Sequence, residues 1–236
     1  MKRELITALD FPTWKETEAF LHQFDRPLFV KVGMELYLQN GPFIIEELKK
    51  KEHRIFLDLK LHDIPNTVKR AMRGLASLGI DLINVHAAGG KHMMEAALEG
   101  LTEGVIKGYD RPKLIAVTQL TSTSEEQMKR EQNIVSSLEE SVLHYALLAK
   151  SAGLDGVVCS SQEVPSIQQK CGEDFLTVTP GIRLASDDAH DQARIVTPKK
   201  AKQLGASSIV VGRSITQANN PVEAYEKILT EWESVS

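Results

Sequence analysis

The chain has 236 residues, of which 42% are hydrophobic, 25% are charged and 6% are aromatic. This charged fraction is typical of globular proteins and excludes an intrinsically disordered chain. Its 28 basic and 32 acidic side chains leave a net charge of −4, which gives no general electrostatic reason to bind nucleic acid. Apolar runs are far shorter than the roughly 18 residues that span a bilayer, and no signal peptide is visible. We therefore expect a cytoplasmic protein with reduced Cys159 and Cys171.

Short apolar runs recur along the whole chain. In chain order they predict strands over residues 4–9, 28–32, 55–59, 82–86, 114–118, 156–159, 176–179 and 209–211. Most of these runs are continuously apolar rather than alternating. That pattern is typical of parallel strands covered on both faces.

Helix signals lie between the predicted strands. Thr13 with Glu16, and Ser124 with Gln127, have the spacing of a capping box, in which a hydroxyl and a carboxylate or amide satisfy two free N–H groups. Four prolines are expected in the first turns of helices, where a missing N–H is harmless: Pro42, Pro65, Pro198 and Pro221.

Strand and helix thus alternate about eight times. A doubly wound sheet also alternates, but the first strand here is not followed by the G-x-G-x-x-G loop of dinucleotide-binding folds. Eight units of roughly 30 residues nearly exhaust the chain. The sequence therefore predicts an α/β fold, a single (β/α)8 TIM barrel, with residues 1–236 forming one catalytic domain.

In such a barrel, functional residues lie at the C-terminal ends of the strands. Asp10 ends the first predicted strand, the second contains Lys31, and the third contains Asp58 and Lys60. In a regular extended strand, Asp58 and Lys60 point to the same face, about 7 Å apart. A structural ion pair, with Asp63 capping the next helix, is the simpler alternative. Because several charged groups converge on one barrel mouth, where burial is costly, we favour a functional site.

The last two predicted strands end in segments suited to phosphate. Residues 179–183 end in Arg183, and the eighth strand runs into Gly212 and Arg213. Glycine N–H groups, a helix N-terminus and the fork of an arginine can bind phosphate there, although a turn with a surface arginine has the same local sequence. Residues 184–194 are polar without periodicity, which fits either a lid or an ordinary surface loop. His86 is expected as a hydrogen-bonded imidazole rather than as a metal ligand with His92.

Residues 58–67 read Asp-Leu-Lys-Leu-His-Asp-Ile-Pro-Asn-Thr, and this segment resembles the signature of the orotidine 5′-phosphate decarboxylase family. The resemblance covers essentially the whole chain and is to the shorter bacterial form. Further matching segments fall in order at residues 8–10, 29–33, 84–87, 180–183 and 210–213.

The resemblance implies decarboxylation of orotidine 5′-phosphate to uridine 5′-phosphate, without cofactor or metal, as the last step of de novo pyrimidine synthesis. It implies a charged tetrad of Lys31, Asp58, Lys60 and Asp63, with Lys60 protonating C6 of the pyrimidine. It also implies a homodimer in which Asp63 reaches into the active site of the neighbouring subunit. The substrate-binding residues that it implies are Asp10, Lys31, Ile64, Thr67, Thr121, Arg183, Gln192, Gly212 and Arg213. Within this set, Asp10 and Lys31 match ribose contacts, Thr121 a pyrimidine contact, Ile64 and Thr67 the shared edge, and the remaining four the phosphate site.

Two other functions fit parts of the pattern. A sugar-phosphate decarboxylase or aldolase of the same superfamily shares an Asp-x-Lys-x-x-Asp motif but uses Mg²⁺, with an acidic ligand on the second strand. This chain has Lys31 there, and a lysine repels the ion rather than binding it. A non-catalytic barrel that binds nucleotide phosphate needs Gly212 and Arg213 but not the charged tetrad.

Overall fold

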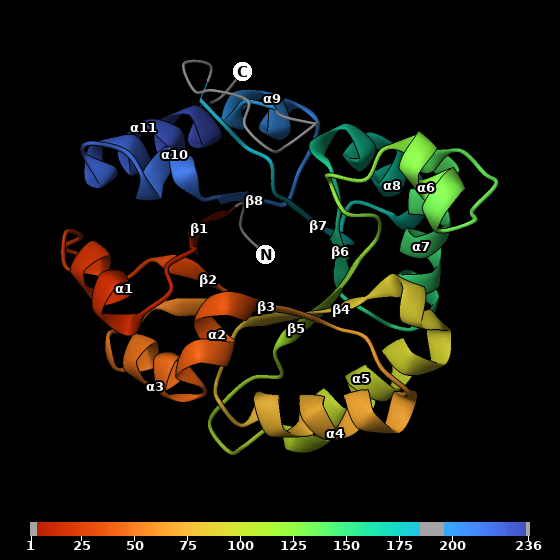
Figure 1. Ribbon diagram of the computed structural model, residues 1–236, viewed down its shortest axis with the longest axis horizontal. Coiled ribbons are helices and arrows are strands. Elements are labelled where there is room, and N and C mark those ends of the chain that lie inside the picture. Colours follow the sequence, from red (N-terminus) through yellow and green to blue (C-terminus); the bar gives the residue numbers. More distant parts are fainter. Residues whose placement is uncertain (1–3, 185–195, 235–236) are drawn as a thin grey trace.

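Eight parallel strands close into a barrel in the order β1 to β8 in this computed structural model, which describes residues 4–184 and 196–234. The helices form a ring around the strands (Figure 1). The predicted (β/α)8 TIM barrel is confirmed. The strands are β1 (Glu4–Leu9), β2 (Phe29–Gly33), β3 (Arg54–Leu61), β4 (Leu82–His86), β5 (Lys113–Val117), β6 (Gly156–Val158), β7 (Leu176–Thr179) and β8 (Ser208–Val211).

The helices in the described residues are α1 (Trp14–Leu21), α2 (Met34–Asn40), α3 (Phe43–Lys50), α4 (Pro65–Ala76), α5 (Gly90–Gly104), α6 (Glu125–Glu131), α7 (Leu138–Ser151), α8 (Val164–Cys171), α9 (Pro198–Gln203), α10 (Arg213–Thr216) and α11 (Pro221–Glu233). Two short 3-10 turns, Ala87–Gly89 and Ser161–Glu163, follow β4 and β6. Within residues 4–184 and 196–234, no helix has both the length and the apolar character needed to cross a membrane.

All eight predicted strands occur, with ends within two residues of the prediction. The largest difference is at β3, which extends to Leu61 rather than to Leu59. The continuous apolar runs identify these strands because each one is packed both against the barrel interior and against the helices.

The helix starts agree with most of the predicted signals. The Thr13 hydroxyl accepts a hydrogen bond from the Glu16 N–H at 3.3 Å, and the Ser124 hydroxyl accepts one from the Gln127 N–H at 3.1 Å. The Glu16 carboxylate accepts the Thr13 hydroxyl rather than its N–H, so that capping box is only half formed. Pro42 is the N-cap of α3, one position before the predicted first turn.

Two apolar layers hold the barrel together. The inner layer fills the space enclosed by the strands and consists of Ile6, Ala8, Phe29, Phe56, Leu82, Ile115, Val178 and Val210. The outer layer lies between strands and helices and includes Leu57, with Leu59 and Leu61 packed against it. Complete burial of one such side chain contributes about 1.5–3 kcal/mol. The two layers therefore give the strand ends a rigid base.

Helix α4, which follows the charged end of β3, is fixed by close packing against α5. A Cβ atom at Gly100 or Gly104 would lie 2.1 Å from the carbonyl oxygen of Lys69 or Arg73, respectively. Glycine is therefore required at both positions of α5 for the backbones to approach this closely. This contact fixes α4, and with it the loop that contains Asp63, against α5.

Candidate active site

A layer of polar side chains lies directly above the inner apolar layer on the first strands. Two residues after Ala8, Phe29 and Phe56 come Asp10, Lys31 and Asp58, and alternation along a strand aims these side chains at the same interior face. Together with Lys60 they line a cavity of about 340 Å³, which we call the mouth cavity. Its other lining residues are Ala8, Phe56, Val117, Gln119, Leu120, Thr121, Ser122, Val158, Pro180, Gly181, Arg183, Val210, Gly212 and Arg213.

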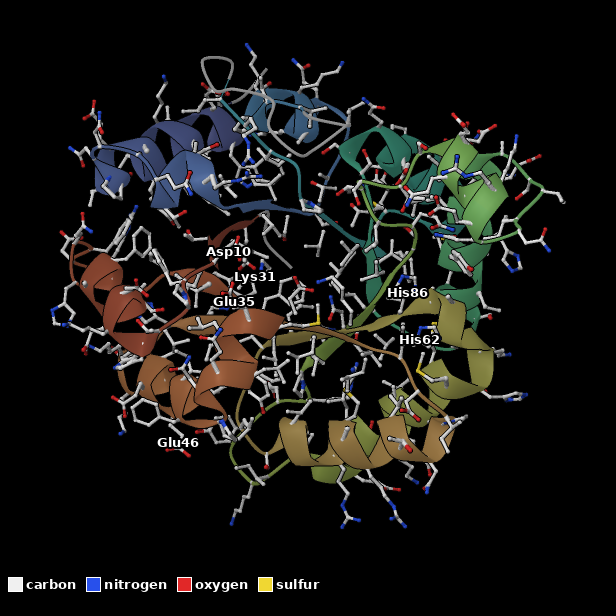
Figure 2. The ribbon with its side chains drawn as sticks, in the orientation of Figure 1. Asp10, Lys31, Glu35, Glu46, His62 and His86 are labelled. Carbon is white, nitrogen blue, oxygen red and sulfur yellow. The ribbon has the colours of Figure 1, made fainter. Side chains whose placement is uncertain are left out.

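Four of these residues form a row of alternating charge. Nζ of Lys31 lies 3.2 Å from Oδ1 of Asp10 and 3.5 Å from Oδ2 of Asp58. Nζ of Lys60 donates a hydrogen bond to Oδ1 of Asp58 at 2.6 Å. Figure 2 shows Asp10 and Lys31 next to each other near the centre of the barrel. Two carboxylates and two ammonium groups sum to zero, so the row places Lys31 and Asp58, its two most buried members, in the barrel mouth without net charge.

The charge row keeps its two buried members, Lys31 and Asp58, ionised. Burial alone lowers the pKa of the Lys31 ammonium, but Asp58 and Asp10 outweigh it and raise that pKa above its usual value. Burial likewise opposes ionisation of Asp58, yet Lys31, Lys60 and Asn84 together hold its pKa below its usual value. Asp58 is therefore a carboxylate at neutral pH.

The backbone at Lys60 is not regular strand. Lys60 has a φ of +53°, in the left-handed region, which costs a residue other than glycine on the order of 1–3 kcal/mol. The register between β3 and β4 shifts there, because Leu57 is paired with Ile83 while Leu61 is paired with Val85. Asp58 and Lys60 both line the mouth cavity, as predicted, but the expected regular strand geometry with a separation of about 7 Å is wrong. The bulge brings the two charged groups into direct contact.

Two glycines allow the charged groups to lie close to the backbone. A Cβ atom at Gly33 would lie 3.2 Å from Nζ of Lys31. A Cβ atom at Gly212 would lie 3.2 Å from Oδ2 of Asp10. Both distances are tighter than ordinary van der Waals contact, so a side chain at either position would displace part of the charge row.

The strands that complete the barrel supply a different lining. Val117, Val158 and Val210 form an apolar wall, and Thr121 with Ser122 adds hydroxyl groups after β5. Arg183 is only 7% exposed, and Arg213, at the start of α10, lines the same cavity. The mouth cavity therefore combines a charged side from β1–β3, an apolar wall, and two guanidinium groups after β7 and β8.

Three of the predicted site residues lie outside the lining of the mouth cavity. Asp63 is exposed and accepts a hydrogen bond from the Ile64 N–H at 2.7 Å, while Ile64 is the N-cap of α4. Ile64 is 67% exposed, and Thr67 is exposed in the first turn of α4. Gln192 and the expected lid from residue 185 onwards lie outside the described residues.

The histidine at the end of β4 has a local role. His86 Nδ1 accepts a hydrogen bond from the Ala88 N–H at 3.2 Å, and its ring stacks on that of His62 with centroids 5.7 Å apart (Figure 2). Burial, then His62 and Lys60, lower the pKa of His86. Across the described parts of the chain, no three His, Cys, Asp or Glu side chains gather as a metal site would require.

Sequence reasoning missed several residues that shape the site. Gln119 lines the mouth cavity, and its amide donates to Gln132 and Ser141, each at 3.1 Å, which ties the loop after β5 to α6 and α7. Asn84 touches both Asp58 and Lys60 from β4. The pattern contained a signal for Asn84, since it is a polar residue inside an otherwise apolar predicted strand.

The whole chain has close relatives of known family. The model of the "Orotidine 5′-phosphate decarboxylase / HUMPS family" matches residues 3–228. The chain belongs to this family. The orotidine 5′-phosphate decarboxylases of Bacillus cytotoxicus and Bacillus mycoides are 64% and 63% identical to it, each over 100% of both chains. The family resemblance inferred from residues 58–67 is therefore confirmed.

Solved structures of similar chains have the same fold. A crystal structure of orotidine 5′-phosphate decarboxylase from Lactobacillus acidophilus has a TM-score of 0.90 and 45% identity, covering 99% of this chain and 100% of that one. An uncharacterised conserved protein from Geobacillus kaustophilus has a TM-score of 0.87 and 54% identity, covering 97% and 100%. Both similarities extend over almost the whole of this chain.

Proposed function

We propose that this chain decarboxylates orotidine 5′-phosphate to uridine 5′-phosphate, the last step of de novo pyrimidine synthesis. The observation that carries the proposal is the charge row, in which Asp58 lies between the ammonium groups of Lys31 and Lys60 at the floor of the mouth cavity. Membership of the decarboxylase family over residues 3–228 supports the same reaction.

The chemistry needs a positive, proton-donating group at C6 of the pyrimidine. When the bond between C6 and the carboxylate breaks, CO2 leaves and the electron pair stays on C6, where the ring delocalises it poorly. The Lys60 ammonium stabilises this charge and transfers a proton from Nζ to C6, and solvent then reprotonates the amine. Asp58, held ionised by its two lysine partners, holds the Lys60 ammonium in place through a hydrogen bond before the reaction. We propose no cofactor for these steps.

The remaining lining residues place the nucleotide. Asp10 and Lys31 are suited to the ribose hydroxyls, and Thr121 to the pyrimidine. The phosphate would lie against Arg183, Gly212 and Arg213. The family resemblance adds Gln192 to this phosphate site. Charge-assisted, forked hydrogen bonds from arginine suit a phosphate dianion. Binding energy gained at this end organises the reacting end and so appears in kcat as well as in KM.

We also propose that the enzyme is a homodimer with active sites shared across the interface. Asp63 and Ile64 lie outside the mouth cavity of their own chain, where the carboxylate of Asp63 and the 67% exposed side chain of Ile64 are free to meet a second copy of the chain. In this arrangement Asp63 completes the charged tetrad of the neighbouring chain, and Ile64 and Thr67 line the shared edge.

The chief alternative is Mg²⁺-dependent chemistry on a sugar phosphate. That reaction requires acidic ligands around the ion, and here the Lys31 ammonium occupies the space between Asp10 and Asp58. An ammonium in this position repels a divalent cation. A non-catalytic phosphate-binding barrel is the second alternative, and the charge row gives such a protein no advantage.

One assay separates the three functions. The purified protein is mixed with orotidine 5′-phosphate and excess chelator, and the loss of orotate absorbance is followed. We expect full turnover. Activity that disappears with chelator and returns with Mg²⁺ would support the metal-dependent alternative, and binding of the nucleotide without turnover would support the non-catalytic one.

Two expectations from the sequence stay predictions. One is that residues 1–236 form a single catalytic domain, which limited proteolysis of the purified chain can test. The other is a cytoplasmic location, which fractionation of the producing cell can test.

A further inference from the structure

Asn84 is a completely buried polar residue beside the mouth cavity. Its exposed fraction is 0%, and it occupies the interior position of β4 two residues after Leu82 of the inner apolar layer. It does not line the mouth cavity, so it does not touch a bound nucleotide. Three residues of β3, from Asp58 to Lys60, lie opposite this single residue of β4, because pairing resumes only at Leu61 and Val85.

The carboxamide of Asn84 bridges the two halves of the β3 bulge. Oδ1 accepts a hydrogen bond from the Lys60 N–H at 2.7 Å, and Nδ2 donates one to Oδ1 of Asp58, also at 2.7 Å. The same Asp58 oxygen accepts the Lys60 ammonium at 2.6 Å. Since a backbone N–H can only donate and an ionised carboxylate can only accept, one side chain must offer both an acceptor and a donor.

We propose that Asn84 is a positioning residue that holds the left-handed backbone of Lys60 and the carboxylate of Asp58 in the arrangement needed for proton transfer to C6. This inference rests on the proposed decarboxylation. The Asn84 amide takes the place of the ladder hydrogen bond that the bulge removes from Lys60. It thereby offsets the cost of the left-handed conformation, which a lysine adopts only when its surroundings impose it.

The charged groups around Asn84 favour an uncharged side chain at this position. The charged groups that face it are Asp58 and Lys60 on β3, with Lys31 on β2 in contact with Asp58. On its other side, Asn84 pairs with Ile115 of β5, which does not titrate, and His86 follows it on β4. A second carboxylate at this position would face the Asp58 oxygen across a hydrogen-bond distance, and the two would share one proton.

Asn84→Leu tests the role of the carboxamide, because leucine has a similar volume and no polar atom. We expect kcat to fall by about 100-fold, as for a catalytic group misplaced by about 1 Å. KM and the affinity for uridine 5′-phosphate should stay near the wild-type values, because the arginines that hold the phosphate are untouched. An unchanged kcat in the folded variant would overturn the proposal.

Asn84→Asp provides a readout that a purely structural role would not change. Its protonated form can still accept from the Lys60 N–H and donate to Asp58, whereas its ionised form repels Asp58. We therefore expect the ratio of variant kcat to wild-type kcat to fall as the pH rises, while the same ratio for Asn84→Leu stays constant. Parallel pH profiles for Asn84→Asp and wild type would contradict the proposal.

Ser208→Ala is the matched control. Ser208 is also a barrel-strand residue with an exposed fraction of 0%, but it lies on β8 away from Lys60. This variant should keep the wild-type kcat, and its unfolding midpoint shows the cost of removing a buried polar atom from the barrel. The wild-type assay is run first. Absence of wild-type turnover refutes the decarboxylation itself, whereas active wild type with an active Asn84→Leu variant refutes only the role of Asn84.

Discussion

Lys60 donates a hydrogen bond from Nζ to Oδ1 of Asp58 at 2.6 Å, although the two residues are only two positions apart in one strand. Neighbours on one face of a regular strand are about 7 Å apart at their backbones. Here the left-handed φ of Lys60 turns the chain at this point. The proposed proton donor, Lys60, and its charge partner, Asp58, are thus provided by one short bulge at the end of β3.

Removal of the Lys60 ammonium should abolish turnover. In Lys60→Ala both the proton donor and the positive charge at C6 are lost, and we expect kcat to fall by at least about 10⁴-fold. Binding of uridine 5′-phosphate, measured by calorimetry, should persist because Arg183 and Arg213 remain. Lys129→Ala, which removes an exposed lysine from α6, is the control and should keep full activity. Substantial turnover in Lys60→Ala would remove Lys60 from its proposed role.

Arg213→Ala should weaken the transition state as well as substrate binding. Truncating one partner of a buried charge pair costs about 2–5 kcal/mol. This corresponds to a loss in kcat/KM on the order of 30- to 5000-fold. We expect part of the loss to appear in kcat, since phosphate binding energy organises the reacting end. Arg130→Ala on the exposed face of α6 removes the same charge elsewhere and should have no effect. A kcat/KM within about threefold of wild type, less than 1 kcal/mol, would refute the role of Arg213.

The sequence predicted the barrel better than it predicted the local geometry of the site. Continuous apolar runs mark strands because burial on both faces is a property of each run itself. Helix α2 was missed because it follows β2 directly and its N-cap, Gly33, has no side chain to signal a start. The left-handed Lys60 was missed for a different reason. Its backbone N–H is bonded to Asn84, which is 24 residues away in the chain, so no local pattern signals this conformation.

We expect His86 to contribute to the loss of folding stability as the pH is lowered. Its pKa lies below the ordinary value near 6.5, because of burial and then the neighbouring His62 and Lys60. As the pH falls below about 6.5, the histidine of the unfolded chain takes up a proton more readily than His86 of the folded chain. The free energy of unfolding therefore decreases as the pH is lowered through this range. Protonation of Nδ1 would also remove the acceptor for the Ala88 N–H.

His86→Asn keeps an acceptor for the Ala88 N–H and removes the titration. Urea unfolding at about pH 7.5 and about pH 5.5, on either side of the ordinary histidine pKa, measures the difference. We expect wild type to lose more stability than His86→Asn between these two values. His92→Asn removes an exposed histidine and should behave like wild type. Equal losses in wild type and His86→Asn would show that His86 does not contribute.

The proposed sharing of Asp63 between subunits predicts complementation. Lys60→Ala and Asp63→Ala chains should each be nearly inactive alone. In a hybrid dimer, one site combines the intact Lys60 of one chain with the intact Asp63 of the other. If subunits of a two-fold symmetric dimer mix at random in equal amounts, half of the dimers are hybrids with one good site each, so about a quarter of the wild-type activity should return.

A second mixture separates sharing between subunits from other effects of mixing. Asp58 and Lys60 belong to the same mouth cavity, so a hybrid of Asp58→Ala and Lys60→Ala chains has a defect in each of its sites. We expect this mixture to stay inactive while the mixture with Asp63→Ala recovers, with subunit exchange verified by differently tagged chains in both cases. If exchange occurs and neither mixture recovers, Asp63 does not act across the interface. If both recover, the gain comes from restored folding, because the charge row of each hybrid site would still lack one member.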